Sequence, residues 1–236
     1  MCGRFAMDDS TNELLEEIVE QHGIRALGEW SKHWPPRYNT APTQDVPVAR
    51  ERNGQREIAS VRWGMVPPRA QKFGAGKPII NARLETVATN GMFKAPFASH
   101  RCIVAAAGYY EWQLRDDGKQ PYFVHQPGRP IAMAAIIRSW ADPSKAEGDP
   151  DTWRLSMAII TRDAHVAPGE VHDRMPACLA PDAVDDWLGD HLGPAELVRL
   201  LDRSSTQVAY DLAHYPVSRE VNNTRNEGEG LIAPQV

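Results

Sequence analysis

The sequence predicts an α+β fold with a mainly antiparallel β core and peripheral helices. Most apolar residues occur in short or alternating runs that glycine and proline interrupt, which is typical of strands. Helical spacing is confined to one segment near the N-terminus and two segments late in the chain. No composition shift or internal repeat divides the 236 residues, so we expect a single domain over residues 1–236.

The first predicted element is an amphipathic helix. Residues 10–13 have the Ser-Thr-Asn-Glu pattern of a capping box, and Gly23 is the predicted end of the helix. The apolar residues between these signals recur at helical spacing and are Leu14, Leu15, Ile18 and Val19.

The predicted strands follow this helix. They cover residues 46–49, 58–66, 78–82, 102–110, 122–125, 131–137, 155–161 and 207–210. Residues 138–151 are polar, contain proline and glycine, and are predicted to form a surface loop. Two segments open with proline and have helical spacing, so residues 181–188 and 194–201 are predicted to be short helices.

The charge balance excludes a uniformly basic surface. Lys and Arg number 26 against 31 Asp and Glu, a formal charge of -5, so any nucleic-acid site must be a local basic channel. Cations gather in the first third of the chain, where ordinary surface charge is the alternative reading; they are Arg4, Arg37, Arg62, Arg69, Lys72 and Arg83.

The three cysteines are too few and too widely spaced for a disulfide framework. They fit a reducing cytoplasm, and no stretch is long and apolar enough to cross a bilayer. Cys102 and Cys178 are most simply core residues. No CxxC, HxxxH or phosphate-loop pattern is present, so the sequence predicts neither a metal nor a cofactor.

Cys2 carries the strongest chemical signal. Removal of Met1 would leave a free α-amine and a thiol on neighbouring carbons, and such a 1,2-aminothiol condenses with an aldehyde to a thiazolidine ring. The amine titrates near about 8 and the thiol near about 8.5, so little tuning of either group is expected. The alternative is that Cys2 is a buried structural thiol.

Three further residues have side chains suited to act with Cys2. Asn81 ends an apolar run and either clamps the terminal amine or closes a turn. Glu111 follows a run apolar enough to be buried, and is either a proton-transfer group with a raised pKa or the partner of an arginine. His172 adjoins Asp173 and Arg174, and either moves protons or is structural.

Seven segments taken together resemble the SOS-response-associated peptidase (SRAP) family, whose members process abasic sites in single-stranded DNA. They occur in the family's order along nearly the whole chain and are residues 2–5, 37–43, 62–67, 81–86, 108–112, 172–176 and 221–223. The resemblance implies a barrel-like SRAP fold. It also implies a single-stranded DNA partner containing abasic sites, at single-strand to double-strand junctions or elsewhere, for a monomeric protein that joins the nucleoid when bound to DNA.

The resemblance also implies residue roles. Cys2 would bond to the sugar, Asn81 would position its amine, Glu111 would act as acid and base, and His172 would assist ring opening. DNA contacts are implied for Arg4, Asn39, Pro42, Trp63, Arg83 and Arg174, with the arginines on phosphates and with Pro42 and Trp63 on an apolar surface where bases are displaced.

This chain departs from the family pattern at two places. Many relatives carry a further Trp where this chain has Pro67, Pro68 and Arg69, and Gln113 stands where a basic residue is common. Two other classes of function remain open. One is an N-terminal-nucleophile amidohydrolase or peptidase that uses the same thiol, and the other is a sensor that binds single-stranded DNA without reacting.

Overall fold

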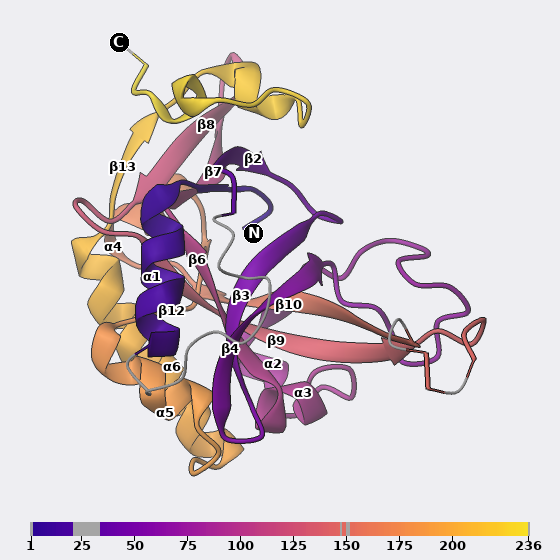
Figure 1. Ribbon diagram of the computed structural model, residues 1–236. Helices are drawn as coiled ribbons and strands as arrows, with labels where there is room; N and C mark the ends of the chain where they lie inside the picture. The colour runs from indigo at the N-terminus through magenta and orange to yellow at the C-terminus, as the bar shows by residue number, and fades with distance from the viewer. Residues whose placement is uncertain (1, 21–33, 147, 150–151, 236) are drawn as a thin grey trace.

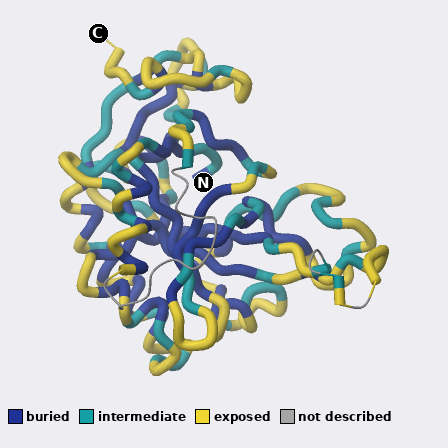
Figure 2. Tube along the Cα trace, in the orientation of Figure 1, coloured by how far each residue is buried: buried dark blue, intermediate teal, exposed yellow. Residues whose placement is uncertain are grey.

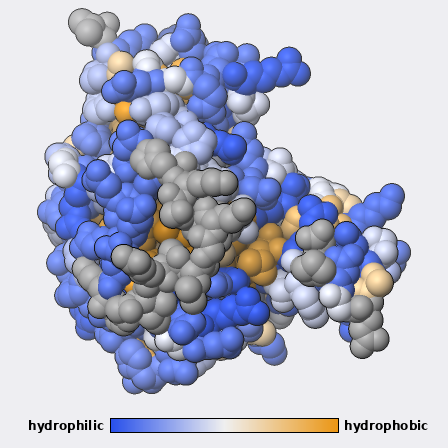
Figure 3. All heavy atoms as spheres, viewed as in Figure 1, coloured by the Kyte–Doolittle hydropathy of each residue, from blue (hydrophilic) through white to orange (hydrophobic). Residues whose placement is uncertain are grey.

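The computed structural model describes residues 2–20, 34–146, 148–149 and 152–235. It contains two β-sheets with helices on the outside, which confirms the predicted α+β class (Figure 1). The buried parts of the chain concentrate where the strands cross, and exposure rises toward the loops (Figure 2). Hydrophilic side chains cover most of the face in Figure 3, and apolar ones show in a hollow beside the projecting lobe.

The larger sheet contains a closed ring of five strands. They are β3 (Asp45–Arg52), β4 (Gln55–Trp63), β6 (Arg101–Ala106), β9 (Ile131–Ala141) and β10 (Trp153–Asp163). β9 pairs with both β6 and β10, and β10 pairs in parallel with β4, which closes the ring. Three short strands extend the sheet and are β5 (Asn81–Arg83), β11 (Arg174–Pro176) and β12 (Cys178–Leu179). The barrel-like core is therefore mainly antiparallel, as the sequence predicts.

Alternate residues of the ring strands enter two different apolar clusters because side chains of a strand point to opposite faces. On β9, Met133 and Ala135 belong to the cluster that also holds Cys2 and Trp63. Their neighbours Ala134 and Ile136 belong to the cluster that the helices cover. The first cluster therefore fills the barrel, and Cys2 is a fully buried member of it.

The smaller sheet is antiparallel throughout and lies against the barrel. Its order is β13–β8–β7–β1–β2, with β1 (Phe5–Met7), β2 (Arg37–Thr40), β7 (Gly108–Arg115), β8 (Gly118–His125) and β13 (Ala213–Pro216). Gly108 is required where β7 meets β8, since a Cβ at this position would lie 2.6 Å from the carbonyl oxygen of Val124. This close approach sets the register that carries Glu111.

The helices lie outside the barrel. They are α1 (Asp9–Glu20), α2 (Leu84–Val87), α3 (Lys94–Ser99), α4 (Val166–Val171), α5 (Val184–Leu188) and α6 (Pro194–Asp211). Three 3-10 turns complete the described elements and are η3 (Pro181–Ala183), η4 (Arg219–Asn222) and η5 (Glu229–Ile232). No helix in the described residues is both long and apolar enough to cross a membrane.

Several predicted boundaries are wrong. Residues 207–210 are the end of α6 rather than a strand, because the helix that Pro194 opens continues past residue 201. Residues 102–110 form two strands, β6 and β7, of different sheets. The predicted loop from residue 138 begins later, since β9 reaches Ala141. The predicted cap at Ser10 is displaced, because the helix begins at Asp9 and the Asp8 carboxylate accepts the N–H of Thr11 at 3.3 Å. Gly23 lies outside the described residues.

Candidate active site

Asn81 holds the backbone of Cys2. It is the first residue of β5, which pairs with β10 so that Asn81 lies opposite Ile159. Its Nδ2 donates a hydrogen bond to the carbonyl oxygen of Cys2 at 2.9 Å. Its Oδ1 is buried and accepts no hydrogen bond from any residue that the structure describes. A buried acceptor without a donor is costly, so Asn81 presents an acceptor at the N-terminal end of the chain where an amine would satisfy it.

The Cys2 side chain is completely buried in the barrel cluster with Phe5, Trp63 and Tyr109. Burial raises the pKa of the Cys2 thiol far above its ordinary value, and the charge of Glu111 raises it further. The expectation that the thiol needs little tuning is therefore wrong. Burial therefore favours the neutral thiol at neutral pH, and formation of a thiolate here would require a nearby group to accept the proton.

Glu111 lies in the middle of β7, opposite Tyr122 of β8. Only 3% of its surface is exposed. Burial raises the pKa of the Glu111 carboxyl to about 7, and the charge of Asp173 contributes in the same direction. Such a carboxyl is present in both its acid and base forms near neutral pH, which suits it to donate and accept protons.

His172 follows α4 directly and is partly buried. Two contacts at its Nδ1 favour opposite protonation states. The backbone N–H of Arg174 donates to Nδ1 at 3.0 Å, which favours the neutral ring, while an Asp173 carboxylate oxygen 2.7 Å away favours the charged ring. Burial lowers the pKa of His172, and Asp173 opposes that shift only in part, so the ring is neutral at neutral pH.

Glu111 and His172 line the same open cleft, with a volume of about 460 Å³. Trp112, Lys119 and Asn222 complete its lining, and the Trp112 indole N–H donates to the side-chain oxygen of Asn222 at 2.7 Å. The segments that resemble the family contain Trp112 and Asn222, but the sequence predicts no role for either residue. Lys119 belongs to the β7–β8 hairpin and carries no sequence signal.

Arg4 and Asn39 hold the C-terminal segment in place. Arg4 Nη1 donates to Asn39 Oδ1 at 2.6 Å and to the carbonyl oxygen of Val221 at 2.8 Å. The Asn39 amide is fully buried and donates to the carbonyl oxygens of Asn223 and Asn226, each at 2.9 Å. Asn39 therefore has no surface available to DNA, which corrects its predicted role. In Arg4, Nη1 is used in hydrogen bonds within the fold.

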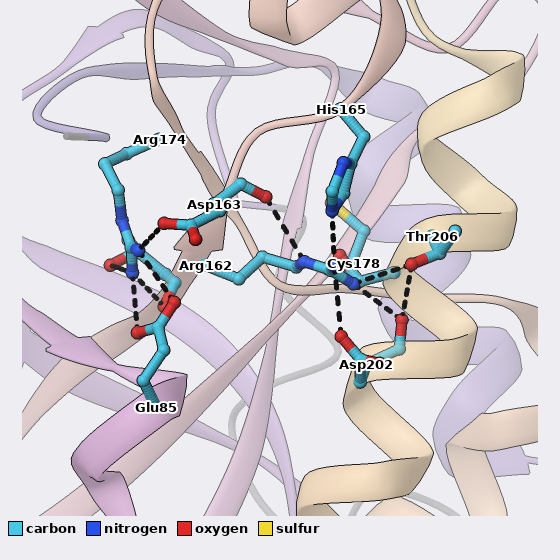
Figure 4. A network of polar contacts seen from close by, with 10 residues as sticks. Glu85, Arg162, Asp163, His165, Arg174, Cys178, Asp202 and Thr206 are labelled. Atoms are coloured by element: carbon cyan, nitrogen blue, oxygen red, sulfur yellow. Dashed lines mark hydrogen bonds and ion pairs between the residues drawn. The ribbon is translucent and has the colours of Figure 1, made fainter.

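The two other predicted phosphate-binding arginines differ sharply. Arg83 is exposed and makes no ion pair with any described residue. Arg174 is bound by two carboxylates, with its Nη1 2.7 Å from Glu85 Oε1 and 2.5 Å from Asp163 Oδ1 (Figure 4). Its Nη2 also donates to the carbonyl oxygen of Thr161 at 2.8 Å. A phosphate at Arg174 would therefore have to share it with existing acceptors.

Trp63 does not form part of an exposed apolar surface. Its ring is completely buried, lies 5.0 Å from the ring of Phe5 between centroids, and donates its indole N–H to the carbonyl oxygen of Ile80 at 3.0 Å. Stacking on a base would require this core to open, so the predicted role of Trp63 is corrected. Pro42 is half-buried in the turn between β2 and β3 and keeps an accessible face.

The site thus belongs to the class in which an N-terminal cysteine lies in the core of a β-barrel, held by an amide and beside a carboxyl and an imidazole. The family model of the SOS response associated peptidase (SRAP) matches residues 1–224, and the chain belongs to this family. Relatives along its full length agree. It is 34% identical to the abasic site processing protein YedK of Escherichia coli K12 over 236 residues, covering 99% of this chain and 100% of YedK.

Other relatives extend the similarity to animals. The abasic site processing protein HMCES of Gallus gallus is 30% identical over 270 residues, which covers 99% of this chain and 78% of that protein. A crystal structure of a Bacteroides thetaiotaomicron protein matches with a TM-score of 0.80 at 21% identity over the whole of both chains. A phage-related protein from Bordetella bronchiseptica matches with a TM-score of 0.67 at 27% identity over 92% of this chain and 95% of that one.

Proposed function

We propose that this chain processes abasic sites in single-stranded DNA by covalent capture through Cys2 after Met1 is removed. The observation that carries the proposal is the hydrogen bond from Asn81 to the Cys2 carbonyl, beside a carboxyl whose pKa burial raises to about 7. The names of the full-length relatives describe abasic site processing and support the substrate in this proposal.

The first step opens the sugar. An abasic deoxyribose is mostly a closed hemiacetal, and proton transfers by Glu111 and the neutral His172 convert it to the open-chain aldehyde. The amine of Cys2 then attacks C1′, and loss of one water gives an imine. Asn81 Oδ1 accepts an amine hydrogen and so directs the nitrogen lone pair toward the aldehyde.

The second step closes the ring. The Cys2 sulfur bonds to C1′, its proton passes to the imine nitrogen, and the product is a thiazolidine that joins protein to DNA. Glu111 relays this proton because the buried thiol does not ionise by itself. Holding sulfur and imine on adjacent carbons supplies an effective molarity of about 10⁵ M or more. Without the thiol the imine can undergo β-elimination, which would make the protein a lyase.

Intact-mass analysis with and without a uracil-excised oligonucleotide tests the proposal. Matured protein should gain the mass of the oligonucleotide less one water, and the same oligonucleotide without an abasic site should give no gain. The starting mass reports in the same measurement whether Met1 is absent. Unchanged mass of correctly matured protein would overturn the proposal.

The family description also names a peptidase, and the same thiol would serve an amidohydrolase. We propose that any peptide chemistry here is limited to removal of Met1, since the open cleft carries Trp112 and Lys119, side chains suited to a base and a phosphate. Turnover of glutamine or peptide substrates in the absence of DNA, with no adduct on abasic DNA, would favour the amidohydrolase instead.

A further inference from the structure

The loop between β4 and β5 has an unusual charge pattern. Residues 58–84 contain no Asp or Glu, and the cations within them are Arg62, Arg69, Lys72, Lys77 and Arg83. The loop projects beside the β9–β10 hairpin, away from α1, α5 and α6 (Figure 1). We name residues 67–77 the cationic arm, after Arg69, Lys72 and Lys77.

The cations of the arm are exposed and unpaired. Arg69, Lys72 and Lys77 all lie on its surface. None of the three makes an ion pair or a side-chain hydrogen bond with a residue that the structure describes. What distinguishes the arm is that no Asp or Glu occurs among residues 58–84, although acids outnumber bases by five in the whole chain. Three uncompensated charges on one short loop of an acidic protein favour an anionic partner.

The arm is fixed at its base by stacking. The guanidinium carbons of Arg154 and Arg62 lie 3.9 Å and 5.8 Å from the centroid of the Phe73 ring. Trp140 packs against Phe73 with ring centroids 5.7 Å apart, and its indole N–H donates to the carbonyl oxygen of Ala70 at 3.0 Å. Contacts of a cation with an aromatic face are worth about 0.5–1 kcal/mol each when exposed.

Glycine permits this packing. A Cβ at Gly74 would lie 2.8 Å from the Arg62 guanidinium, and its φ of +73° is one that other residues rarely adopt. The loop therefore closes tightly over Arg62. Because its base is packed in this way, the arm presents its three cations from a defined position, and binding does not have to order a flexible chain.

Both ends of the arm lead to the candidate active site. Before its start, at the end of β4, Arg62 Nη1 donates to the carbonyl oxygen of Thr43, and the N–H of Thr43 donates to the carbonyl oxygen of Trp63 at 2.7 Å. These bonds join the arm to the turn that contains Pro42. At its end, β5 begins with Asn81, which holds Cys2. The arm thus continues the surface on which a bound strand would pass the nucleophile.

We propose that the cationic arm binds the phosphates of the DNA strand on one side of the lesion, with Arg69, Lys72 and Lys77 as the contacting residues. This inference rests on the proposed function for the position of the lesion, but binding by the arm does not require the covalent reaction. The occupant is a single strand rather than an acidic protein, because the arm leads directly to β5, whose first residue Asn81 holds Cys2.

The test measures binding of undamaged single-stranded DNA by fluorescence anisotropy across a salt series. In the triple variant Arg69→Gln, Lys72→Gln, Lys77→Gln, the slope of log K against log salt should become shallower by about 2. Each of the three lost phosphate contacts contributes about 0.7 to this slope. That corresponds to about 50-fold weaker binding in about 0.15 M salt. The matched control Arg129→Gln, Arg199→Gln, Arg203→Gln changes the same charge with exposed residues far from the arm, and should leave the slope unchanged.

A second variant, Phe73→Leu, keeps every charge but removes the ring under Arg62 and Arg154, and should weaken binding less than the triple variant does. Thermal melting of each variant verifies that it is folded. Equal slopes for the triple variant and its control would overturn the proposal, as would failure of the native protein to bind any DNA. If the arm variant loses slope while the native protein forms no adduct on abasic DNA, the arm stands and the proposed function fails.

Discussion

The active-site cleft and the cationic arm use polar side chains in opposite ways. In the cleft, Glu111 is almost fully buried and its pKa is raised to about 7, and its charge adds to the effect of burial in raising the pKa of the Cys2 thiol. On the arm, Arg69 and Lys72 are exposed and make no ion pairs with described residues. Desolvation tunes a group for proton transfer, whereas exposure keeps a charge available to phosphate. Changes in the cleft should therefore alter rates, and changes on the arm should alter affinity.

The largest expected effect is at the nucleophile. Cys2→Ala with Met1 removed keeps the amine and loses the sulfur, so an imine should form and the strand should be nicked, with no stable adduct. Denaturing gels of abasic oligonucleotides before and after heating measure both outcomes. DNA affinity should stay the same, because the Cys2 side chain is buried. A heat-stable adduct from this variant would contradict the thiazolidine assignment.

Replacement of Glu111 should slow the reaction without weakening binding. Glu111→Gln removes the proton-transfer group and should lower the rate of adduct formation by about 10²–10⁴ at saturating DNA. If the carboxylic acid opens the sugar, the native rate falls as pH rises through about 7, and this limb should be absent in the variant. Single-turnover rates of adduct formation, measured for both proteins across a pH series, test whether this fall in rate depends on Glu111. A native alkaline limb that persists in the variant would assign the limb to another group.

Substitution of Trp63 tests whether this residue contributes to stability or to DNA binding. Its ring fills the barrel, so Trp63→Leu should cost about 3 kcal/mol of unfolding free energy. DNA affinity, measured well below the melting temperature, should remain within about 2-fold of the native value because the ring faces no solvent. Urea denaturation and anisotropy give the two numbers. A large loss of affinity with unchanged stability would restore Trp63 to the DNA surface.

The smallest expected effect is a change in stability with pH. A pKa of the Glu111 carboxyl raised from 4.5 to about 7 means that the folded state holds this proton more tightly than the unfolded state. The associated stability is present below about 4.5 and is lost as pH rises through about 7, by at most about 3 kcal/mol. Glu111→Gln should therefore match the native protein at pH 4 and exceed its stability at pH 8 in urea titrations. Equal differences at both pH values would show that the carboxyl is not desolvated.

Local chemical signals predicted much of the site. Asn81 contacts Cys2, although through the carbonyl oxygen, so its predicted role on the amine stays a prediction. Glu111 has the raised pKa that its apolar and aromatic surroundings indicate. The prediction for Glu111 succeeded because the apolar strand that buries it and the carboxyl itself are both apparent in one short stretch of sequence. The thiol was misjudged because the solution pKa ignores desolvation, which depends on residues as distant as Met157 and Cys178 in the same cluster.

Other errors came from long-range packing. Trp63 and Asn39 belong to motifs that suggest DNA contacts, but tertiary structure buries Trp63 in the barrel and Asn39 against the C-terminal segment. Residues 207–210 have the composition of a strand and adopt a helix, because a short apolar run does not distinguish the two and the preceding helix propagates through it. These features depend on contacts that no local pattern records.

The clamp of Arg4 and Asn39 on residues 221–226 joins distant parts of the chain into one support for the cleft. Arg4 binds the carbonyl oxygen of Val221, 217 positions further along, and the next residue, Asn222, lines the cleft beside Trp112. The shape of this wall is therefore a property of the assembled fold, and no short peptide excised from either region could reproduce it.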